Sequence, residues 1–111
     1  CPVVDDFYSG MQVTVPLFAE QISCSSSKIA DIYRAKYQDP VVAFCDKSDN
    51  DGFLCAGALS GTDGMKISVY GNDERILLSA VYDNLGKGAS GAALENLNLV
   101  MGKDKAFGLD I

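Results

Sequence analysis

Two apolar runs in the second half of the chain constrain its fold more than any other feature. Lys66–Tyr70 and Ile76–Tyr82 are rich in β-branched, aromatic and large aliphatic residues, and the polar segment Gly71–Glu74 separates them. Two such runs around a short segment of turn-forming residues predict a β-hairpin. A hairpin needs further elements to cover its apolar face, so the rest of the chain is expected to supply strands and helices.

Upstream of this hairpin, the residue pattern predicts a strand, a helix and a second, shorter strand. Met11–Phe18 alternates well enough for a strand, and Pro16 pushes that strand toward a sheet edge or a bend. Ser25–Ser27 offers capping hydroxyls for a helix over Lys28–Tyr37, which should end before the next proline. Val41–Cys45 is a short strand. The helix should bury a stripe made of Ile29, Ile32, Tyr33 and Lys36.

Downstream of the hairpin, a last helix is predicted from about Ala89 to Met101, with Gly102 as its C-terminal cap. This order of elements predicts an α+β fold with helices on one face of the sheet. The length of 111 residues and the 48% hydrophobic content suit one domain over residues 1–111. The last helix carries an apolar stripe of Ala89, Ala93, Leu97, Val100 and Met101.

The composition argues against several classes of function. Nine Lys and Arg residues are scattered among fifteen Asp and Glu, for a net charge of −6, so no basic cluster is available for nucleic acid. No apolar run is long enough to cross a bilayer, and no signal peptide is recognisable. The chain has no histidine and no C-x-x-C pair, which argues against a metal site.

The cysteines at positions 1, 24, 45 and 55 are expected to be free and reduced, as in a cytoplasmic protein. A chain with this much apolar material does not need disulfides to form a core. A secreted, disulfide-bonded scaffold is the alternative.

The motif Gly86–Gly91 (GKGASG) allows three interpretations. It matches the G-x-G-x-x-G of dinucleotide-binding turns, because it follows a predicted strand, opens a helix, and has Asp110 about twenty residues on. However, only Gly102–Ile111 follows the helix, and the preceding strand ends in the polar pair Asp83–Asn84. The glycines can instead serve a tight turn, or let the helix N-terminus, with Lys87 beside it, face an anion or a cofactor held elsewhere.

The remaining residues offer little catalytic chemistry. Without histidine there is no common general base for neutral pH, and no Cys–His or Ser–His pair. Asp5–Asp6 and Asp49–Asp51 are interpreted as an exposed loop and an exposed turn, not as acid–base or calcium sites. The domain alone is not expected to be catalytic.

Three segments resemble one enzyme family. Val81–Met101 (VYDNLGKGASGAALENLNLVM) is similar to the D-N-L-x-K-G-A-[SA]-G-x-A-x-x-N-x-N signature of N-acetyl-gamma-glutamyl-phosphate reductases. Cys1–Pro16 resembles that family's T-P…G-M-x-x-x-V-P segment, and Leu59–Met65 its L-x-G-T-N-x-M element, with Asp63 in place of Asn. The three segments lie at both ends and in the middle of the chain, so the resemblance extends over essentially its whole length.

The resemblance implies a substrate-binding and dimerisation domain, similar to the C-terminal domain of glyceraldehyde-phosphate and aspartate-semialdehyde dehydrogenases, with a mixed, largely antiparallel sheet. An N-terminal Rossmann domain, absent here, would carry most of the NADP site and the nucleophilic cysteine. The complete enzyme would reduce N-acetyl-glutamyl phosphate to the semialdehyde in arginine biosynthesis, in the cytoplasm. A homo-oligomer would form through the helix-free sheet face, with alternating residues of Lys66–Tyr70 and Ile76–Tyr82 as candidates.

Site residues carry over from the matching motifs. Asn84, Lys87, Gly88 and Ala89 are expected to line the place where the acyl phosphate meets the nicotinamide, together with Gly10 and Met11. Gly61 and Thr62 match a motif without an assigned role. One subgroup of the family has a histidine where this chain has Val3, so the general base stays open. Two alternatives remain: a non-catalytic dimerisation or ligand-binding module, and the corresponding aminoadipate-phosphate reductase of lysine biosynthesis.

Overall fold

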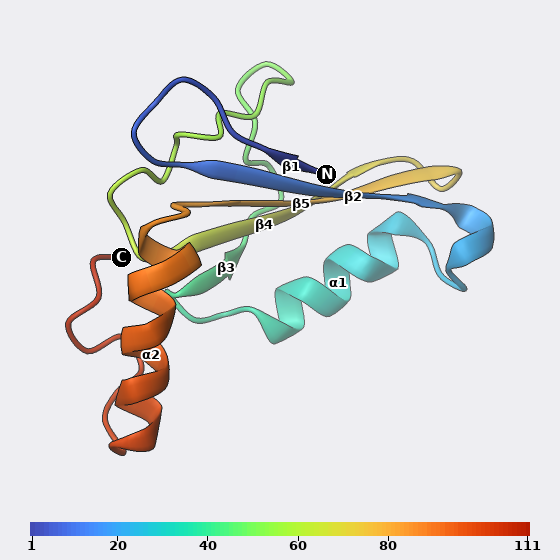
Figure 1. Ribbon diagram of the computed structural model, residues 1–111. Helices are drawn as coiled ribbons and strands as arrows, with labels where there is room; N and C mark the ends of the chain where they lie inside the picture. Colours follow the sequence, from blue (N-terminus) through green and yellow to red (C-terminus); the bar gives the residue numbers. More distant parts are fainter.

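The computed structural model describes residues 1–111 and contains one five-stranded sheet in the order β1-β2-β5-β4-β3 (Figure 1). The predicted hairpin forms its centre as β4 (Met65–Gly71) and β5 (Arg75–Tyr82), which are antiparallel. On the other side of β5 lies antiparallel β2 (Met11–Phe18), followed by β1 (Pro2–Val3). On the far side of β4, β3 (Val42–Phe44) runs parallel to it. The sheet is therefore mixed and largely antiparallel.

One face of the sheet is apolar across neighbouring strands. The register places Ile67 and Val13 on either side of Ala80, because β5 pairs with both β4 and β2. Helix α1 (Ser26–Lys36) packs on this face and covers part of it (Figure 1). Between helix and sheet lies a groove of about 340 Å³. Nine of the ten residues that line it are hydrophobic: Val13, Val15, Tyr33, Tyr37, Val42, Met65, Ile67, Leu78 and Ala80, with Ser79 as the tenth.

The opposite face of the sheet carries no helix, but it is not bare. The segment between β3 and β4 crosses it (Figure 1), and Ser48 fixes that segment to β4 through its hydroxyl, 2.6 Å from Ser68 Oγ. The Ser48 backbone N–H also donates to the hydroxyl of Tyr70 at 3.0 Å. The segment also approaches β5, because Leu54 and Leu77 line the same hollow.

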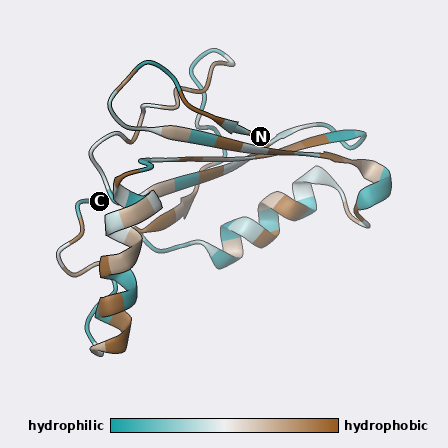
Figure 2. Cartoon of the chain, viewed as in Figure 1, coloured by the Kyte–Doolittle hydropathy of each residue, from teal (hydrophilic) through white to brown (hydrophobic).

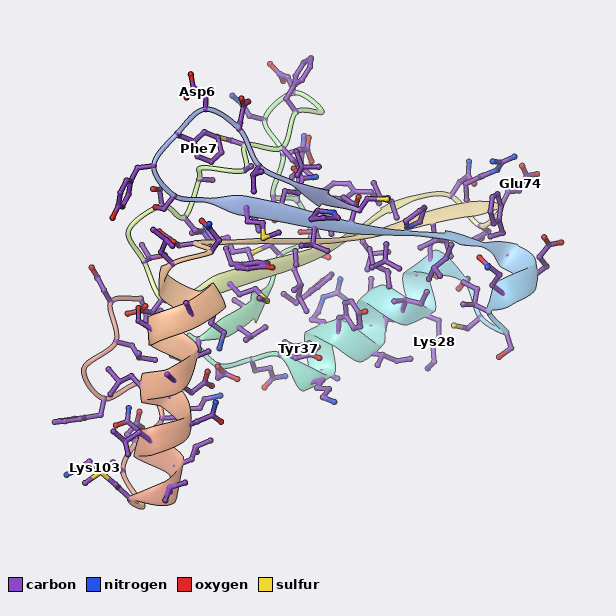
Figure 3. All side chains as sticks on the ribbon, viewed as in Figure 1. Asp6, Phe7, Lys28, Tyr37, Glu74 and Lys103 are labelled. Carbon is purple, nitrogen blue, oxygen red and sulfur yellow. The ribbon has the colours of Figure 1, made fainter.

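Helix α1 follows the predicted span closely, but only part of the predicted stripe, Ile29 and Tyr33, faces the sheet. Ser25 caps it by accepting the N–H of Lys28 at 3.3 Å. Ile29 is buried as predicted, whereas Ile32 is 49% exposed and Lys36 is exposed. Aromatic packing is the reason. Tyr33 contacts Tyr37 and the β3 residue Phe44 edge-on, and Tyr33 and Tyr37 line the groove against the sheet. Tyr37 is labelled in Figure 3.

The last helical segment begins earlier than predicted and lies beyond the end of the sheet. A five-residue π-helical turn, η2 (Gly86–Ser90), leads into α2 (Gly91–Val100), and Gly102 adopts the left-handed conformation of a C-terminal cap (φ +66°). In Figure 1, α2 lies on the same side as α1 but extends away from the sheet.

The predicted apolar stripe on this helix is wrong. All five of its members are exposed, and hydrophobic residues lie open along α2 (Figure 2). The helix instead buries Gly91 and Asn98. Asn98 donates through Nδ2 to the carbonyl oxygens of Lys105 and Phe107, at 3.1 and 2.8 Å, so the chain after α2 folds back along it. The exposed members are Ala89, Ala93, Leu97, Val100 and Met101.

The predicted fold class, α+β with a mixed, largely antiparallel sheet, is confirmed. The two-residue strand β1 was not predicted. β1 pairs only with Gln12 and Val13, so the rest of β2 is an edge of the sheet. Pro16 lies in this edge part, where its missing N–H leaves no neighbouring strand without a hydrogen bond. No helix of the structure is long and apolar enough to cross a membrane.

Candidate functional site

A buried carboxylate marks the end of β5. Asp83 follows the last strand residue and is 2% exposed. Its Oδ2 atom accepts the hydroxyl of Ser9 at 2.6 Å and the backbone N–H of Gly61 at 2.5 Å. Its Oδ1 atom accepts the backbone N–H groups of Leu85 and Gly86 at 2.7 and 3.0 Å. One side chain therefore joins three segments that are far apart in the sequence.

These hydrogen bonds determine the charge of Asp83. Burial by itself would raise the pKa of this carboxyl group, but the hydrogen bonds from Ser9, Gly86, Gly61 and Leu85 stabilise the charged form more strongly. The pKa of Asp83 falls to about 2, from an ordinary value of 3.8. Asp83 is thus a carboxylate at neutral pH and acts as an acceptor only.

Strand pairing brings Asn84 to the start of β2. Met11 lies opposite Tyr82, so the residues just after β5 face those just before β2. The Asn84 side-chain oxygen accepts the backbone N–H of Gly10 at 2.8 Å, and the Tyr82 hydroxyl donates to the sulfur of Met11 at 3.3 Å. Gly10 has φ +127°, and a Cβ there would lie 2.7 Å from the carbonyl oxygen of Ala56. Only glycine suits this position.

The turn at Gly61–Thr62, which had no role assigned from sequence, supports the glycine motif. Besides the Gly61 N–H bond to Asp83, the Thr62 carbonyl oxygen lies where a Cβ on Gly86 would have to be. A Cβ on Gly91 would collide with the carboxylate of Asp63. The glycines of the motif therefore let the last helical segment approach this turn closely.

The dinucleotide interpretation of Gly86–Gly91 is wrong, and the interpretation as a tight turn is supported. No parallel strand follows α2, and Asp110 is engaged elsewhere: its N–H donates to Asp63 Oδ2 at 3.0 Å, and its carbonyl accepts the N–H of Asp63 at 2.6 Å. The N–H groups of Leu85 and Gly86, at the start of the helical segment, are already bound by Asp83. These two N–H groups are therefore not available to an anion.

Lys87 is the one basic residue of the motif, and it is paired. Its Nζ atom forms an ion pair with Oε2 of Glu95, which lies eight residues farther along the helical segment η2–α2. Both side chains are largely shielded, at 11% and 17% exposure. Glu95 was not singled out from the sequence. Its presence means that the charge of Lys87 is compensated until something displaces Glu95.

The other predicted site residues lie around this turn. Gly88 donates its N–H to the Asp83 carbonyl at 2.8 Å, and it lies exposed beside Ala89 in η2. Gly88 and Ala89 do not line the nearby polar hollow of about 390 Å³, whereas Gly86 and Ser90 do, together with Ser9, Ser60 and Asp83. The hydroxyls of Ser9 and Ser60 are 2.7 Å apart. The pairing of β2 with β5 thus brings Gly10, Met11 and Asn84 together at one end of the sheet. Lys87, Gly88 and Ala89 follow directly in η2.

The acidic pairs Asp5–Asp6 and Asp49–Asp51 do not bind the residues around Asp83. Asp6 lies on the outside of the N-terminal loop (Figure 3), and the Asp5 carboxylate accepts the Asp6 N–H at 2.8 Å, as in an exposed turn. Asp49 accepts the N–H of Gly52 at 2.8 Å, which closes a turn as predicted. The four cysteines are unpaired, and Cys45 is the least exposed of them.

Asp83 and Ser9 are the residues that sequence reasoning missed. In the sequence, Asp83 is the polar end of an apolar strand and the first residue of the D-N-L signature, two signals that could have singled it out, but it was given no role. The 74-residue separation between Asp83 and Ser9 leaves no local pattern to connect them.

Comparison with known proteins extends over nearly the whole chain. No family model matches the chain. It is 42% identical to N-acetyl-gamma-glutamyl-phosphate reductase 2 of Nostoc sp., over 97% of this chain and 37% of that protein. It is also 42% identical to N-acetyl-gamma-glutamyl-phosphate reductases of Brucella ovis and Brucella suis, over 92% of this chain and 35% of theirs. The chain spans little more than a third of the length of these relatives. Over nearly all of its own length, the chain is similar to N-acetyl-gamma-glutamyl-phosphate reductases.

Proposed function

We propose that residues 1–111 form the substrate-binding and dimerisation domain of an NADP-dependent N-acetyl-gamma-glutamyl-phosphate reductase. The observation that carries this proposal is the assembly around Asp83 of all three segments that resemble the family. Ser9–Gly10, Gly61 and the Asn84–Lys87 turn meet at one end of the sheet. The 42% identity to named reductases over most of the chain supports it.

This domain does not fit a dinucleotide by itself. The glycine turn has its first N–H groups bound by Asp83, and the carboxylate of Asp63 lies against Gly91, which would repel a pyrophosphate. NADP would therefore be bound mainly by a separate Rossmann domain of the complete enzyme. That domain would also supply the nucleophilic cysteine, because none of the four cysteines here lines the hollow beside Asp83.

The residues of this chain would bind and orient the acyl phosphate. Asn84 has its amide oxygen fixed by Gly10, which leaves its NH₂ group as a donor to a substrate oxygen. Lys87 would supply positive charge for the phosphate after exchanging Glu95 for it. Gly88 and Ala89, which are small and exposed, would let the substrate approach the turn.

We also propose a cytoplasmic homo-oligomer in which the helix-free sheet face is an interface. The uncovered part of that face near β2 includes Pro16 and Phe18, both exposed. Light scattering of the complete protein at high micromolar concentration is expected to give at least a dimer mass. A strictly monomeric mass would contradict this part of the proposal.

The experiment that tests the function uses both the complete parent protein and residues 1–111. The parent should reduce NADP when given N-acetylglutamate semialdehyde and phosphate, and the 111-residue chain should not. Turnover by the isolated chain would contradict the assignment of the NADP site and the nucleophilic cysteine to a separate domain. The aminoadipate analogue should be assayed in parallel, because one methylene contributes only about 1–3 kcal/mol of discrimination. A preference for that analogue would assign the chain to the lysine pathway instead.

A further inference from the structure

Asp83 fixes both partners of the hydrogen bond between Asn84 and Gly10. Through Oδ2 it holds the hydroxyl of Ser9, the residue next to Gly10. Through Oδ1 it holds the N–H groups of Leu85 and Gly86, the residues that follow Asn84. The backbone on either side of the Asn84–Gly10 contact is therefore tied to one buried carboxylate.

The hydrogen bond between Asn84 and Gly10 determines which end of the Asn84 amide is free. The oxygen faces the N–H of Gly10 at 2.8 Å, an arrangement that the reversed amide would not tolerate because two donors would then meet. The Nδ2 atom makes no hydrogen bond within the chain, and Asn84 is only half-buried. The amide is thus held with its donor available and its acceptor used.

We propose that Asp83 is a positioning residue of the reductase, which orients the Asn84 amide so that its NH₂ group donates to the acyl oxygen of the substrate. This inference rests on the proposed function. Asp83 itself would not touch the substrate, because both of its oxygens are already occupied by the protein. A donor aimed at an oxygen that gains negative charge during reaction stabilises the transition state more than the ground state.

The substitution that tests the proposal is Asp83→Asn in the complete parent enzyme. The amide keeps the shape of the side chain but offers one acceptor oxygen in place of two, so two of the four donors lose their partner. We expect kcat to fall at least tenfold with KM changed less than threefold. Asp73→Asn is the matched control, because the Asp73 carboxylate also accepts an N–H and a hydroxyl, both from Ser26, near the opposite end of the sheet. Its kcat should equal that of the wild type.

A double-mutant cycle with Asn84→Ala separates positioning from a general structural role. If Asp83 acts through Asn84, Asp83→Asn should lower kcat by less than twofold in the Asn84→Ala background. Multiplicative losses in the double variant, or a wild-type kcat in Asp83→Asn, would overturn the proposal. Should Asp83→Asn not fold, Ser9→Ala removes a single bond to Asp83, and the same cycle with Asn84→Ala applies to it.

Hydrogen exchange provides a readout that does not depend on the reaction. In the complete protein, Asp83→Asn should speed exchange of the Gly10 and Gly61 amides at least tenfold, while amides in the centre of β4 are unchanged. If the parent shows no phosphate-dependent reductase activity but these amides do respond, the proposed function fails and the positioning of Asn84 stands. If the parent is active and the Gly10 amide does not respond, the positioning role fails alone.

Discussion

The carboxylate of Asp63 lies against Gly91, at the point where η2 passes into α2, and it leaves no room for a Cβ. Asp63 is not free to move aside, because its backbone and side chain both bind Asp110. We expect Gly91→Ala to lower the free energy of unfolding by about 1–3 kcal/mol, the usual cost of overpacking a tight contact. Urea unfolding followed by circular dichroism would measure it.

Gly57→Ala is the matched control for this prediction. A Cβ at Gly57 would meet only ordinary contacts, the nearest at 3.9 Å from the ring of Phe7, and its φ is not in the left-handed region. Its unfolding free energy should stay within about 0.5 kcal/mol of the wild type. Equal stability of the Gly91→Ala and Gly57→Ala variants would show that the approach of α2 to Asp63 is not a constraint.

Acid should remove the contribution that Asp83 makes to stability. Its pKa is lowered to about 2 in the folded protein, from an ordinary value of 3.8. The unfolded state therefore binds this proton first as pH falls, and the stabilisation is complete above pH 3.8 and lost as pH falls through about 2. The difference in unfolding free energy between wild type and Asp83→Asn should be largest near pH 6 and shrink toward pH 2. A difference independent of pH would contradict the charged state assigned to Asp83.

The strands and the first helix could be predicted from sequence because their signals are local. β2, β4 and β5 alternate or carry β-branched runs, and the hydroxyls before α1 are true capping groups. β1 has only two residues and exists through its pairing with β2, so no local pattern reveals it. The stripe on α2 was misassigned because Asn98, a polar residue, is what binds the returning C-terminal segment.

The sequence motifs of the site could be predicted, but the place where they meet could not. The segments around Gly10, Gly61 and Asn84 could each be singled out in the sequence, but their meeting point is a carboxylate whose partners are up to 74 residues away. The glycine motif shows a second limit. Glycines are needed both where backbone approaches a phosphate and where a helix approaches a neighbouring turn, so the same spacing fits two structures. Here the contacts with Thr62 and Asp63 show that it is the second.

The four thiols should be titratable without reductant. All are unpaired, with Cys1, Cys24 and Cys55 exposed and Cys45 partly shielded. We expect four equivalents to react with Ellman's reagent after denaturation, and Cys45 to react more slowly than the others in the folded protein. A count of zero in the denatured protein would indicate disulfides and an oxidising compartment, against the proposed cytoplasmic location.

Lys87 and Glu95 allow a role in substrate binding to be separated from a role in folding. Lys87→Met in the complete enzyme should lower kcat/KM at least tenfold, or about 1.4 kcal/mol of transition-state stabilisation, if the Lys87 charge binds the acyl phosphate. The same change leaves the Glu95 carboxylate without its partner at 17% exposure, so we expect the free energy of unfolding to fall as well, by about 1–3 kcal/mol.

The double variant Lys87→Met/Glu95→Gln removes both charges of this pair and so restores most of the lost stability, because no unpaired carboxylate remains. Its kcat/KM should stay as low as that of Lys87→Met, since the positive charge for the phosphate is still missing. Steady-state kinetics and urea unfolding of the same preparations measure the two effects. Recovery of wild-type kcat/KM together with stability would mean that Lys87 serves only to pair Glu95, and that the motif is a structural turn.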